Sequence, residues 1–238
     1  MSRKLVKILG YGVDTFSSEE AVDYIATHHG MVVTINPEMI EYAAKDEKFA
    51  QIINSAELVI PDGVGITVGL KILGHNVHRI PGIDFGKALL KRASKDGKTV
   101  ALIGAKPEII TKAVENVKQE FPDLNIVYFH DGYFDDEDTI ITEVINAKPD
   151  YVFAALGSPK QEFFINRLKQ DLNKSVLIGL GGSFDVWAGA VKRAPEIYQK
   201  LGVEWLYRTL SEPKRFKRIF PTLPLFVIKV LKERVIGK

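Results

Sequence analysis

Residues 31–65 read MVVTINPEMIEYAAKDEKFAQIINSAELVIPDGVG and contain two short apolar runs, Met31–Ile35 and Leu58–Ile60. Both runs are continuously apolar instead of alternating, which is typical of strands buried on both faces of a parallel sheet. Each run ends abruptly in polar and turn-forming residues, and helical sequence separates the two. This order of strand, helix and strand predicts an α/β sheet in which ligands bind beyond the carboxyl ends of the strands.

Three polar side chains lie at or just beyond the ends of these two runs, namely Thr34, Asn36 and Asp62. If the two strands are neighbours, the three side chains face one pocket, where a carboxylate can act as a general base or hold a metal ion. A purely structural interpretation is also open. Asp62 would then cap the following helix, and Asn36-Pro37 would only turn the chain.

The alternation of strands and helices continues from residue 5 to about residue 187. Further strands are predicted at Leu5–Leu9, Thr99–Gly104, Asn125–Phe129, Tyr151–Leu156 and Val176–Leu180. Helical sequence fills the intervals, including one helical segment from Pro37 to Ser55. We therefore predict the α/β class, with a Rossmann-like, mainly parallel sheet covered by helices on both faces and a basic helical appendage at the C-terminus.

The character of the sequence changes after Pro195. Strand patterns stop, and helical, aromatic and basic sequence follows. Prolines inside this segment should divide it into short helices, because an interior proline removes a backbone hydrogen bond. These prolines are Pro213, Pro221 and Pro224. We expect residues 1–195 to form a Rossmann-like core domain and residues 196–238 to form an appendage to it.

Charge is distributed unevenly along the chain. The whole sequence carries a net charge of +2, but residues 205–238 contain nine Lys or Arg and two Glu, a local charge of +7. The remaining residues therefore carry a net charge of −5. A basic end on an acidic body predicts a negatively charged partner for that end, although a solvated helical surface has a similar composition.

The segment LFVIKVLKERV at residues 225–235 is predicted to form an amphipathic helix, with Lys229 and Lys232 away from its apolar face. The apolar residues on or near that face are Leu225, Ile228, Leu231 and Val235. A basic amphipathic helix of this kind lies in the headgroup plane of a membrane. The alternative is that the helix packs on the body of the protein or on a sister subunit.

Composition excludes several classes of site. The 238-residue chain has 46% hydrophobic and 26% charged residues, which is ordinary for a soluble globular protein. It contains no cysteine, so disulfides, thiolate metal sites and cysteine nucleophiles are excluded. No apolar run approaches the roughly 20 residues of a membrane-spanning helix, and the amino terminus has the pattern of a strand and not of a signal peptide. We expect a cytoplasmic protein.

Two glycine-rich turns follow predicted strands and open predicted helices. They are Gly157-Ser158-Pro159-Lys160-Gln161 and Gly181-Gly182-Ser183. Free backbone amides at a helix start favour an anion such as phosphate. Neither turn matches the dinucleotide fingerprint or the Walker A pattern, so NAD and ATP are poorly supported. Two such turns in one sheet predict a different nucleotide ligand.

The acidic run Asp136-Glu137-Asp138 contains the D-x-D spacing associated with metal-bound sugar nucleotides. It stands at the start of a predicted helix, where acidic residues stabilise the helix dipole, and we favour that structural role. No His, Asp or Glu cluster has convincing metal spacing. The sequence therefore predicts neither a metal site nor another cofactor.

Several blocks of the sequence together resemble a known family. They are TINPE at 34–38, PDGVG at 61–65, RIPG at 79–82, GSPKQE at 157–162, GGSFD at 181–185, RAP at 193–195 and GVEWLYR at 202–208. In this order, across nearly the whole chain, they resemble the signature blocks of the WecG/TagA/CpsF glycosyltransferases. The one difference in these blocks is Val203, where leucine is usual.

The resemblance implies transfer of a sugar from a UDP-sugar onto an undecaprenyl-diphosphate-linked sugar. The TagA branch, which this sequence resembles most, moves N-acetylmannosamine onto lipid-linked N-acetylglucosamine in the linkage unit of wall teichoic acid. The resemblance further implies an inverting, metal-independent reaction by a peripheral protein on the inner face of the cell membrane. A homo-oligomer is expected in solution, and nucleic acid is not an expected partner.

The resemblance also assigns roles to individual residues. It places Thr34, Asn36, Asp62, Arg79 and Gln161 in the active site, with Asp62 as the base. Arg208, Arg215 and Arg218 would complete the site over the diphosphate. For the UDP moiety of the donor we predict Tyr133, Gly157, Lys160, Gly181, Gly182, Phe184 and Asp185.

Other functions remain open at this point. The donor sugar could be the uronic acid of N-acetylmannosamine, or glucose, within the same family. An NAD-dependent sugar-nucleotide dehydrogenase or epimerase would use the same fold, but it needs a dinucleotide fingerprint that the sequence lacks. A non-catalytic membrane- or RNA-binding module would use the basic tail, but it leaves the polar residues at the strand ends unexplained.

Overall fold

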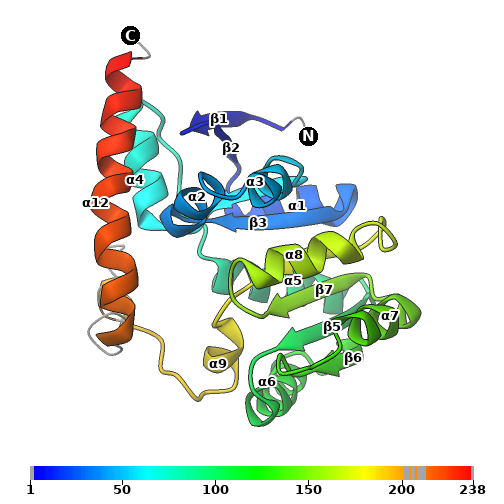
Figure 1. Cartoon of the computed structure of the whole chain (residues 1–238). Helices are drawn as coiled ribbons and strands as arrows, with labels where there is room; N and C mark the ends of the chain where they lie inside the picture. Colours follow the sequence, from blue (N-terminus) through cyan, green and yellow to red (C-terminus); the bar gives the residue numbers. More distant parts are fainter. Residues whose placement is uncertain (1–2, 201–203, 205–206, 208–212, 237–238) are drawn as a thin grey trace.

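A single parallel sheet forms the centre of the protein in the computed structural model (Figure 1). The structure describes residues 3–200, 204, 207 and 213–236, and their side chains except at 199–200 and 213–221. The sheet has the strand order β4-β3-β8-β7-β5-β6, with every neighbouring pair parallel. The strands are β3 (Gly30–Ile35), β4 (Leu58–Pro61), β5 (Thr99–Gly104), β6 (Asn125–His130), β7 (Tyr151–Ala155) and β8 (Val176–Gly179).

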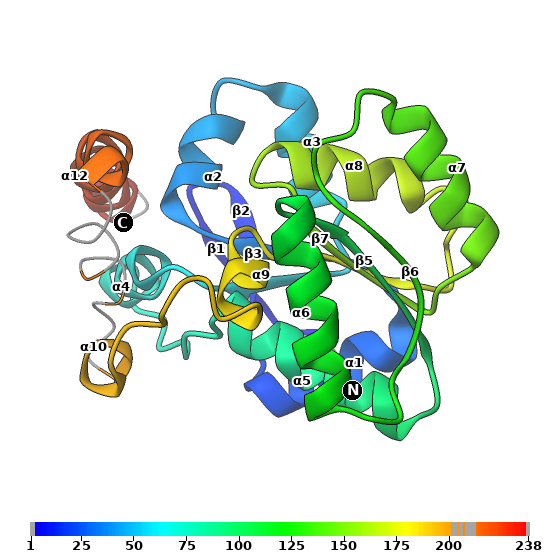
Figure 2. The same ribbon diagram turned by 90° about the horizontal axis from the view of Figure 1, so that it is seen from below.

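Helices cover both faces of this sheet (Figure 2). One face carries α2 (Pro37–Ala43), α3 (Glu47–Asn54), α7 (Glu137–Ala147) and α8 (Lys160–Leu168). The other carries α1 (Ser18–His28), α5 (Gly82–Lys95), α6 (Pro107–Glu120) and α9 (Ser183–Trp187). The remaining helices are α4 (Val64–Ile72), α10 (Glu196–Lys200) and α12 (Pro213–Ile236). The predicted α/β class is confirmed.

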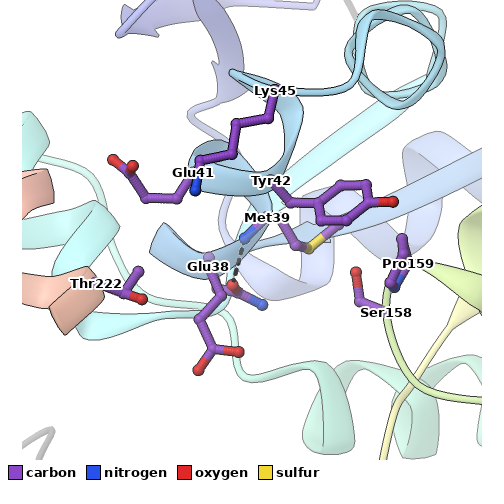
Figure 3. A pocket seen from close by; sticks show the side chains of 9 residues that line it. Glu38, Met39, Glu41, Tyr42, Lys45, Ser158, Pro159 and Thr222 are labelled. Atoms are coloured by element: carbon purple, nitrogen blue, oxygen red, sulfur yellow. Dashed lines mark hydrogen bonds between the residues drawn. The ribbon is translucent and has the colours of Figure 1, made fainter. Parts of the chain in front are cut away.

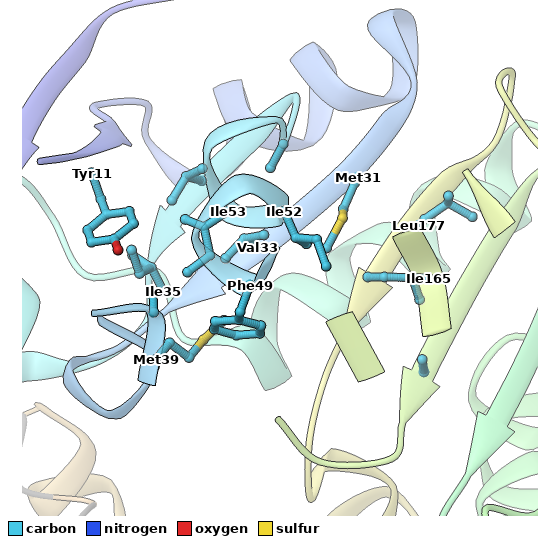
Figure 4. Packing of buried hydrophobic residues seen from close by; sticks show 14 of the residues in the cluster. Tyr11, Met31, Val33, Ile35, Met39, Phe49, Ile52, Ile53, Ile165 and Leu177 are labelled. Carbon is cyan, nitrogen blue, oxygen red and sulfur yellow. The ribbon is translucent and has the colours of Figure 1, made fainter. Parts of the chain in front are cut away.

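The alternation of side chains along β3 explains how one strand serves two cores. Met31, Val33 and Ile35 point into the hydrophobic cluster beneath α2 and α3 (Figure 4), whereas Val32 points into the cluster beneath α5. Successive side chains of a strand alternate between the two faces of a sheet. Thr34 therefore shares its face with Val32, on the side of α5.

The sheet has a topological switch point between β3 and β8. These strands are neighbours, but α2 follows β3 on one face and α9 follows β8 on the other. The two connections diverge there, and ligands of open α/β sheets bind in the crevice that such a divergence leaves beyond the carboxyl ends of the strands. In Figure 1 the strand arrows point toward the side where α9 and α12 lie.

The first predicted strand does not belong to this sheet. Residues 5–14 form an antiparallel hairpin of β1 (Leu5–Ile8) and β2 (Tyr11–Asp14), so the expectation that Leu5–Leu9 opens the parallel sheet was wrong. Leu9 and Gly10 both have positive φ, at 49° and 87°, which suits the two-residue turn of a hairpin. The buried Asp14 side chain accepts a hydrogen bond from the Val59 amide at 2.8 Å, which attaches the hairpin to β4.

Two predicted helix boundaries also change. The helical segment predicted from Pro37 to Ser55 is two helices, because the side chain of Asp46 accepts a hydrogen bond from the Phe49 amide at 3.0 Å and starts α3 anew. The expected division of the C-terminal segment at Pro221 and Pro224 was wrong, although Pro213 does mark a helix boundary. A single helix, α12, begins at Pro213 and continues past Pro221 and Pro224.

Packing against the core explains why α12 tolerates its prolines. A proline at the first helical position removes no hydrogen bond, and each interior proline removes one. Against this loss, Phe226 and Val230 lie one turn apart on α12 and are fully buried. Gly65 and Gly69 of α4 allow this close approach, since a Cβ on Gly69 would lie 3.1 Å from the ring of Phe226 and one on Gly65 would lie 3.3 Å from Leu223.

Polar contacts also fix α12 to the core. Lys229 forms an ion pair with Glu41 of α2 at 2.7 Å, and the carboxylate of Glu233 accepts a hydrogen bond from the Leu9 amide at 2.9 Å. The other side of the helix is apolar but exposed, at 51% for Leu225, 49% for Ile228, 47% for Leu231 and 75% for Val235. The described helices include none with the length and apolar character needed to cross a bilayer.

Candidate active site

The predicted neighbours β3 and β4 lie side by side, with Thr34 opposite Ile60. Thr34 and Asp62 meet at Gly82, the first residue of α5. A Cβ on Gly82 would lie 3.2 Å from the Thr34 methyl group and 3.8 Å from Asp62 Oδ2. The Gly82 amide donates to Asp62 Oδ1 at 3.0 Å, and the Thr34 hydroxyl donates to the carbonyl of Gly179 at 3.3 Å. The ends of β3, β4 and β8 thus converge on one site.

The structure separates the two interpretations of Asn36 and Asp62. Asn36 Oδ1 accepts a hydrogen bond from the Met39 amide at 3.0 Å, so Asn36 does cap α2. Asp62 does not cap α4, whose first turn follows Gly63 without a side-chain cap. Its carboxylate faces the amino terminus of α5 instead, and its side chain is 33% exposed. The carboxylate is therefore held in one orientation and is accessible to a ligand.

Arg79 joins Asp62 to a chain of charged side chains. Arg79 Nη2 lies 3.7 Å from Asp62 Oδ1 and 3.7 Å from Glu204 Oε2. Glu204 Oε1 in turn lies 3.8 Å from Nε of Arg193, which forms a bidentate pair with Asp84 of α5. Hydrogen bonds with Asp84 are the main reason that the pKa of Arg193 is raised. Glu204 is 5% exposed, so it connects the C-terminal segment to the site from a buried position.

Gln161 and Glu162 form a second buried polar group at the start of α8. The Gly181 amide donates to Gln161 Oε1 at 2.9 Å, and Gln161 Nε2 donates to Glu162 Oε1 at 2.8 Å. A Cβ on Gly179 would lie 2.5 Å from Gln161 Nε2, so the side-chain amide of Gln161 packs directly on the backbone of β8. Gln161 therefore holds the turn after β8 in place from a buried position, through its hydrogen bond with the Gly181 amide.

Glu162 was missed from the sequence, although it lies in the GSPKQE block. Its side chain is 2% exposed, and Oε2 has no hydrogen-bond partner within the described part of the chain. Burial raises the pKa of Glu162, against a smaller opposing contribution from Gln161 and the nearby Ser158 hydroxyl. A carboxylate directly before the apolar run Phe163-Phe164-Ile165 was the available signal. Glu204, Arg193 and Asp84 were missed as site residues as well.

The two glycine turns are open at the carboxyl edge. Gly157 and Gly181 have positive φ, at 77° and 52°. Apart from their own chain neighbours, none of the described residues comes within 4 Å of a Cβ built on either. Lys160 lies beside the first turn, with Nζ 4.3 Å from the centre of the Phe134 ring. Tyr133 is 71% exposed after the end of β6. Backbone amides, a cation and an aromatic ring therefore gather along the edge from β6 to β8.

Some predicted residues lie elsewhere. Phe184 is fully buried and stacks on Trp187 with a centroid distance of 5.2 Å, so it supports α9 from inside the core. Gly182 is exposed and immediately precedes α9, whereas Asp185 lies in the first turn of that helix and is partly buried. Three predicted arginines lie outside the described side chains, namely Arg208, Arg215 and Arg218.

The acidic run at the start of α7 has the structural role favoured from the sequence. Asp136 caps the helix by accepting from the amides of Asp138 and Thr139, and Glu137 and Asp138 both pair with Arg167. Hydrogen bonds from Thr139 are the main reason that the pKa of Asp136 is lowered. Among the residues described, no group of three His, Asp or Glu side chains has the arrangement of a metal site.

Comparison with known proteins identifies the family. The sequence profile of the WecG/TagA/CpsF glycosyltransferase family matches residues 6–238. The chain belongs to this family. The blocks of the sequence resemblance that contain Thr34, Asp62 and the two glycine turns lie at the carboxyl edge of the sheet.

Curated relatives in this family match over nearly their full length. One from Bacillus spizizenii is 37% identical over 227 residues, covering 94% of this chain and 88% of the relative. One from Staphylococcus aureus strain MW2 is 36% identical over 238 residues, covering 96% and 93%. Both carry the name N-acetylglucosaminyldiphosphoundecaprenol N-acetyl-beta-D-mannosaminyltransferase. Bacillus subtilis strain 168 has a relative of the same name that is 37% identical over 219 residues.

Proposed function

We propose that this glycosyltransferase moves N-acetylmannosamine from UDP-N-acetylmannosamine to N-acetylglucosamine on undecaprenyl diphosphate. The product would be the disaccharide of a wall teichoic acid linkage unit. The observation that carries the proposal is the 36–37% identity, over almost the whole chain, to relatives that bear the name of this transferase. The cluster of Thr34, Asp62 and Arg79 at the switch point of the sheet supplies a matching site.

Asp62 acts as the general base in this proposal. It takes the proton from the acceptor hydroxyl as that oxygen forms a bond with the anomeric carbon of the donor, and the bond between that carbon and UDP breaks. A single displacement of this kind inverts the configuration at the anomeric carbon. Thr34 and Asn36 position the donor sugar, and Gln161 acts through the Gly181 turn, whose amide it holds. The amide of Gly82 keeps Asp62 oriented.

The leaving UDP requires stabilisation of negative charge. We assign this role to the amides of the two glycine turns other than those of Gln161, Gly181 and Ser183, which donate within the protein. Lys160 and the arginines of the appendage share the role, without a metal ion or another cofactor. Arginine neutralises a diphosphate through bidentate hydrogen bonds. The appendage arginines in this assignment are Arg208, Arg215 and Arg218. Their joint replacement by alanine should remove transfer while the core site stays intact.

The appendage is also assigned to the membrane surface, on the inner face of the cell membrane. The exposed stripe of Leu225, Ile228, Leu231 and Val235 on α12 supports this assignment. Each Lys or Arg near an anionic leaflet contributes about 1 kcal/mol, and residues 205–238 carry a net charge of +7. In solution the same stripe would form the contact between subunits of a homo-oligomer. Membrane binding would then compete with oligomerisation.

A transfer assay tests the function directly. The protein is mixed with UDP-N-acetylmannosamine and N-acetylglucosaminyl diphosphate on a short prenyl chain, and UDP release and the disaccharide product are measured. Parallel reactions use the UDP-activated uronic acid and UDP-glucose. In a thermal-shift experiment UDP should raise the melting temperature and NAD should not. Two results would contradict the proposal: stabilisation by NAD, or faster transfer from UDP-glucose or the UDP-activated uronic acid than from UDP-N-acetylmannosamine.

A further inference from the structure

A cavity lies next to the cluster around Asp62 and is not part of it. Its volume is about 280 Å³, it is open on one side, and it is lined by α2, the turn before α8 and α12 (Figure 3). In Figure 3, Thr222 stands on one side and Ser158 with Pro159 on the other, with Glu38 and Tyr42 of α2 between them. The polar and aromatic residues of the lining are Asn36, Glu38, Glu41, Tyr42, Lys45, Ser158 and Thr222.

The cavity adjoins the reacting groups through Asn36. Oδ1 of Asn36 accepts the hydrogen bond that caps α2, and the residue lines the cavity. Gly63 follows Asp62 directly and approaches Asn36 so closely that a Cβ on Gly63 would lie 3.2 Å from the Asn36 Cβ. Ser158, on the opposite wall, belongs to the first glycine turn. A molecule in the cavity therefore lies beside the first glycine turn and near the chain segment that follows Asp62.

The size and lining of the cavity fit one sugar ring. Ligand pockets commonly measure about 300–1,000 Å³, so 280 Å³ is at the small end of that range. A pyranose presents hydroxyl groups at its rim and C–H groups on its face. Carboxylate, amide, ammonium and hydroxyl groups of the lining match the rim, and the ring of Tyr42 matches the face.

Tyr42 is held as a rigid wall for such a ring. Its aromatic ring meets Phe49 edge to face, with centroids 5.0 Å apart at 84°, and its hydroxyl donates to Asp46 Oδ2 at 3.3 Å. The side chain nevertheless remains 40% exposed. A fixed and accessible aromatic face requires little ordering when a ligand binds.

The position of α12 favours the acceptor over the donor as the occupant. Thr222 of α12 lines the cavity, and the ion pair between Lys229 and Glu41 holds this helix against α2. The exposed apolar stripe of α12 faces away from the core, and a sugar that stays attached to a lipid must enter from the side of the membrane. We infer that this cavity binds the N-acetylhexosamine ring of the lipid-linked acceptor; the inference rests on the proposed function.

Steady-state kinetics can test the assignment with a matched pair of double variants. Glu38→Gln/Lys45→Ala changes the lining. Glu47→Gln/Lys48→Ala makes the same chemical changes on exposed side chains of α3 that do not line the cavity. The substrates are UDP-N-acetylmannosamine and N-acetylglucosaminyl diphosphate on a short prenyl chain. The lining variant should raise KM for the acceptor by about tenfold and leave KM for the donor within about twofold.

The control variant should match the wild type in both constants. Tyr42→Leu provides a second change to the lining that retains an apolar contact with Phe49, and melting temperatures establish that each variant is folded. An increase in KM for the donor alone, or an acceptor KM equal to that of the control, would overturn the assignment of the cavity while leaving the transferase function intact. A wild-type protein that transfers no sugar to this acceptor would refute the proposed function, and the assignment with it.

Discussion

Replacing Asp62 by asparagine should separate the chemistry of the site from its folding. Asparagine has the same shape as aspartate, so its side-chain oxygen can still accept the hydrogen bond that Gly82 donates to Asp62 Oδ1 at 3.0 Å. The amide cannot take up a proton, however. If Asp62 is the general base, this single change removes the proton acceptor and leaves the surrounding structure in place.

The two expected effects differ in size. General-base catalysis contributes about 10²–10⁴-fold to the rate, which corresponds to about 3–5 kcal/mol of activation free energy. Folding loses the attraction between Arg79 Nη2 and Asp62 Oδ1, which are 3.7 Å apart, at a side chain that is 33% exposed. Such a pair contributes about 0–1 kcal/mol, and Arg79 retains Glu204 at 3.7 Å. The melting temperature should therefore fall by no more than about 4 °C.

The assay is single-turnover transfer from UDP-N-acetylmannosamine, with UDP affinity and the melting temperature measured on the same samples. The expected result is a loss of about 10²–10⁴ in kcat with unchanged UDP affinity. As a control, Asp84→Asn alters another carboxylate of the charged chain that does not face Gly82, and it should retain far more activity. Turnover within about threefold of the wild type in Asp62→Asn would remove Asp62 as the base.

Three further outcomes are expected. Activity should persist in excess EDTA, because the diphosphate is assigned to amides and cationic side chains; complete loss that Mg²⁺ or Mn²⁺ restores would show that the acidic run at residues 136–138 was wrongly discounted. A protein truncated after Pro195 should stay folded, should no longer co-sediment with anionic vesicles and should lose transfer. If the truncated protein binds vesicles and turns over like the full chain, the appendage has neither role and only the proposal for the core site stands. Glu162→Gln should stabilise the protein increasingly as pH rises from about 4.3, because burial raises the pKa of Glu162 and the wild type loses stability as that carboxyl is forced to ionise. Melting temperatures that differ by the same amount at every pH would refute this account of Glu162.

Local patterns were sufficient for much of this protein. Met31–Ile35 and Leu58–Ile60 were recognisable as buried parallel strands, because burial on both faces requires continuous apolar sequence. Their polar ends, Thr34 and Asp62, followed from the position of ligand sites in such sheets. The acidic start of α7 was also readable, because helix caps depend on residues within one turn of each other.

Other features depend on contacts between distant parts of the chain. The sequence of residues 5–9 has the pattern of a strand of the main sheet. Only the structure shows that it pairs with residues 11–14 in a hairpin, which the hydrogen bond between Asp14 and the Val59 amide attaches to β4. The continuous helix α12 depends on Gly65 and Gly69, more than 140 residues earlier, whose missing side chains admit Leu223 and Phe226. Neither partner can be identified from local periodicity.

The sequence by itself therefore determined the fold class, the edge of the sheet that carries the site and the residue types available there. Tertiary structure alone decided which of those residues cooperate. It joined Asp62 through Arg79 to Glu204, buried Glu162 behind Gln161 and formed the cavity between α2 and α12. The physical reason is that strand and helix patterns arise from neighbours in sequence, whereas desolvation, ion pairing and enclosure arise from neighbours in space.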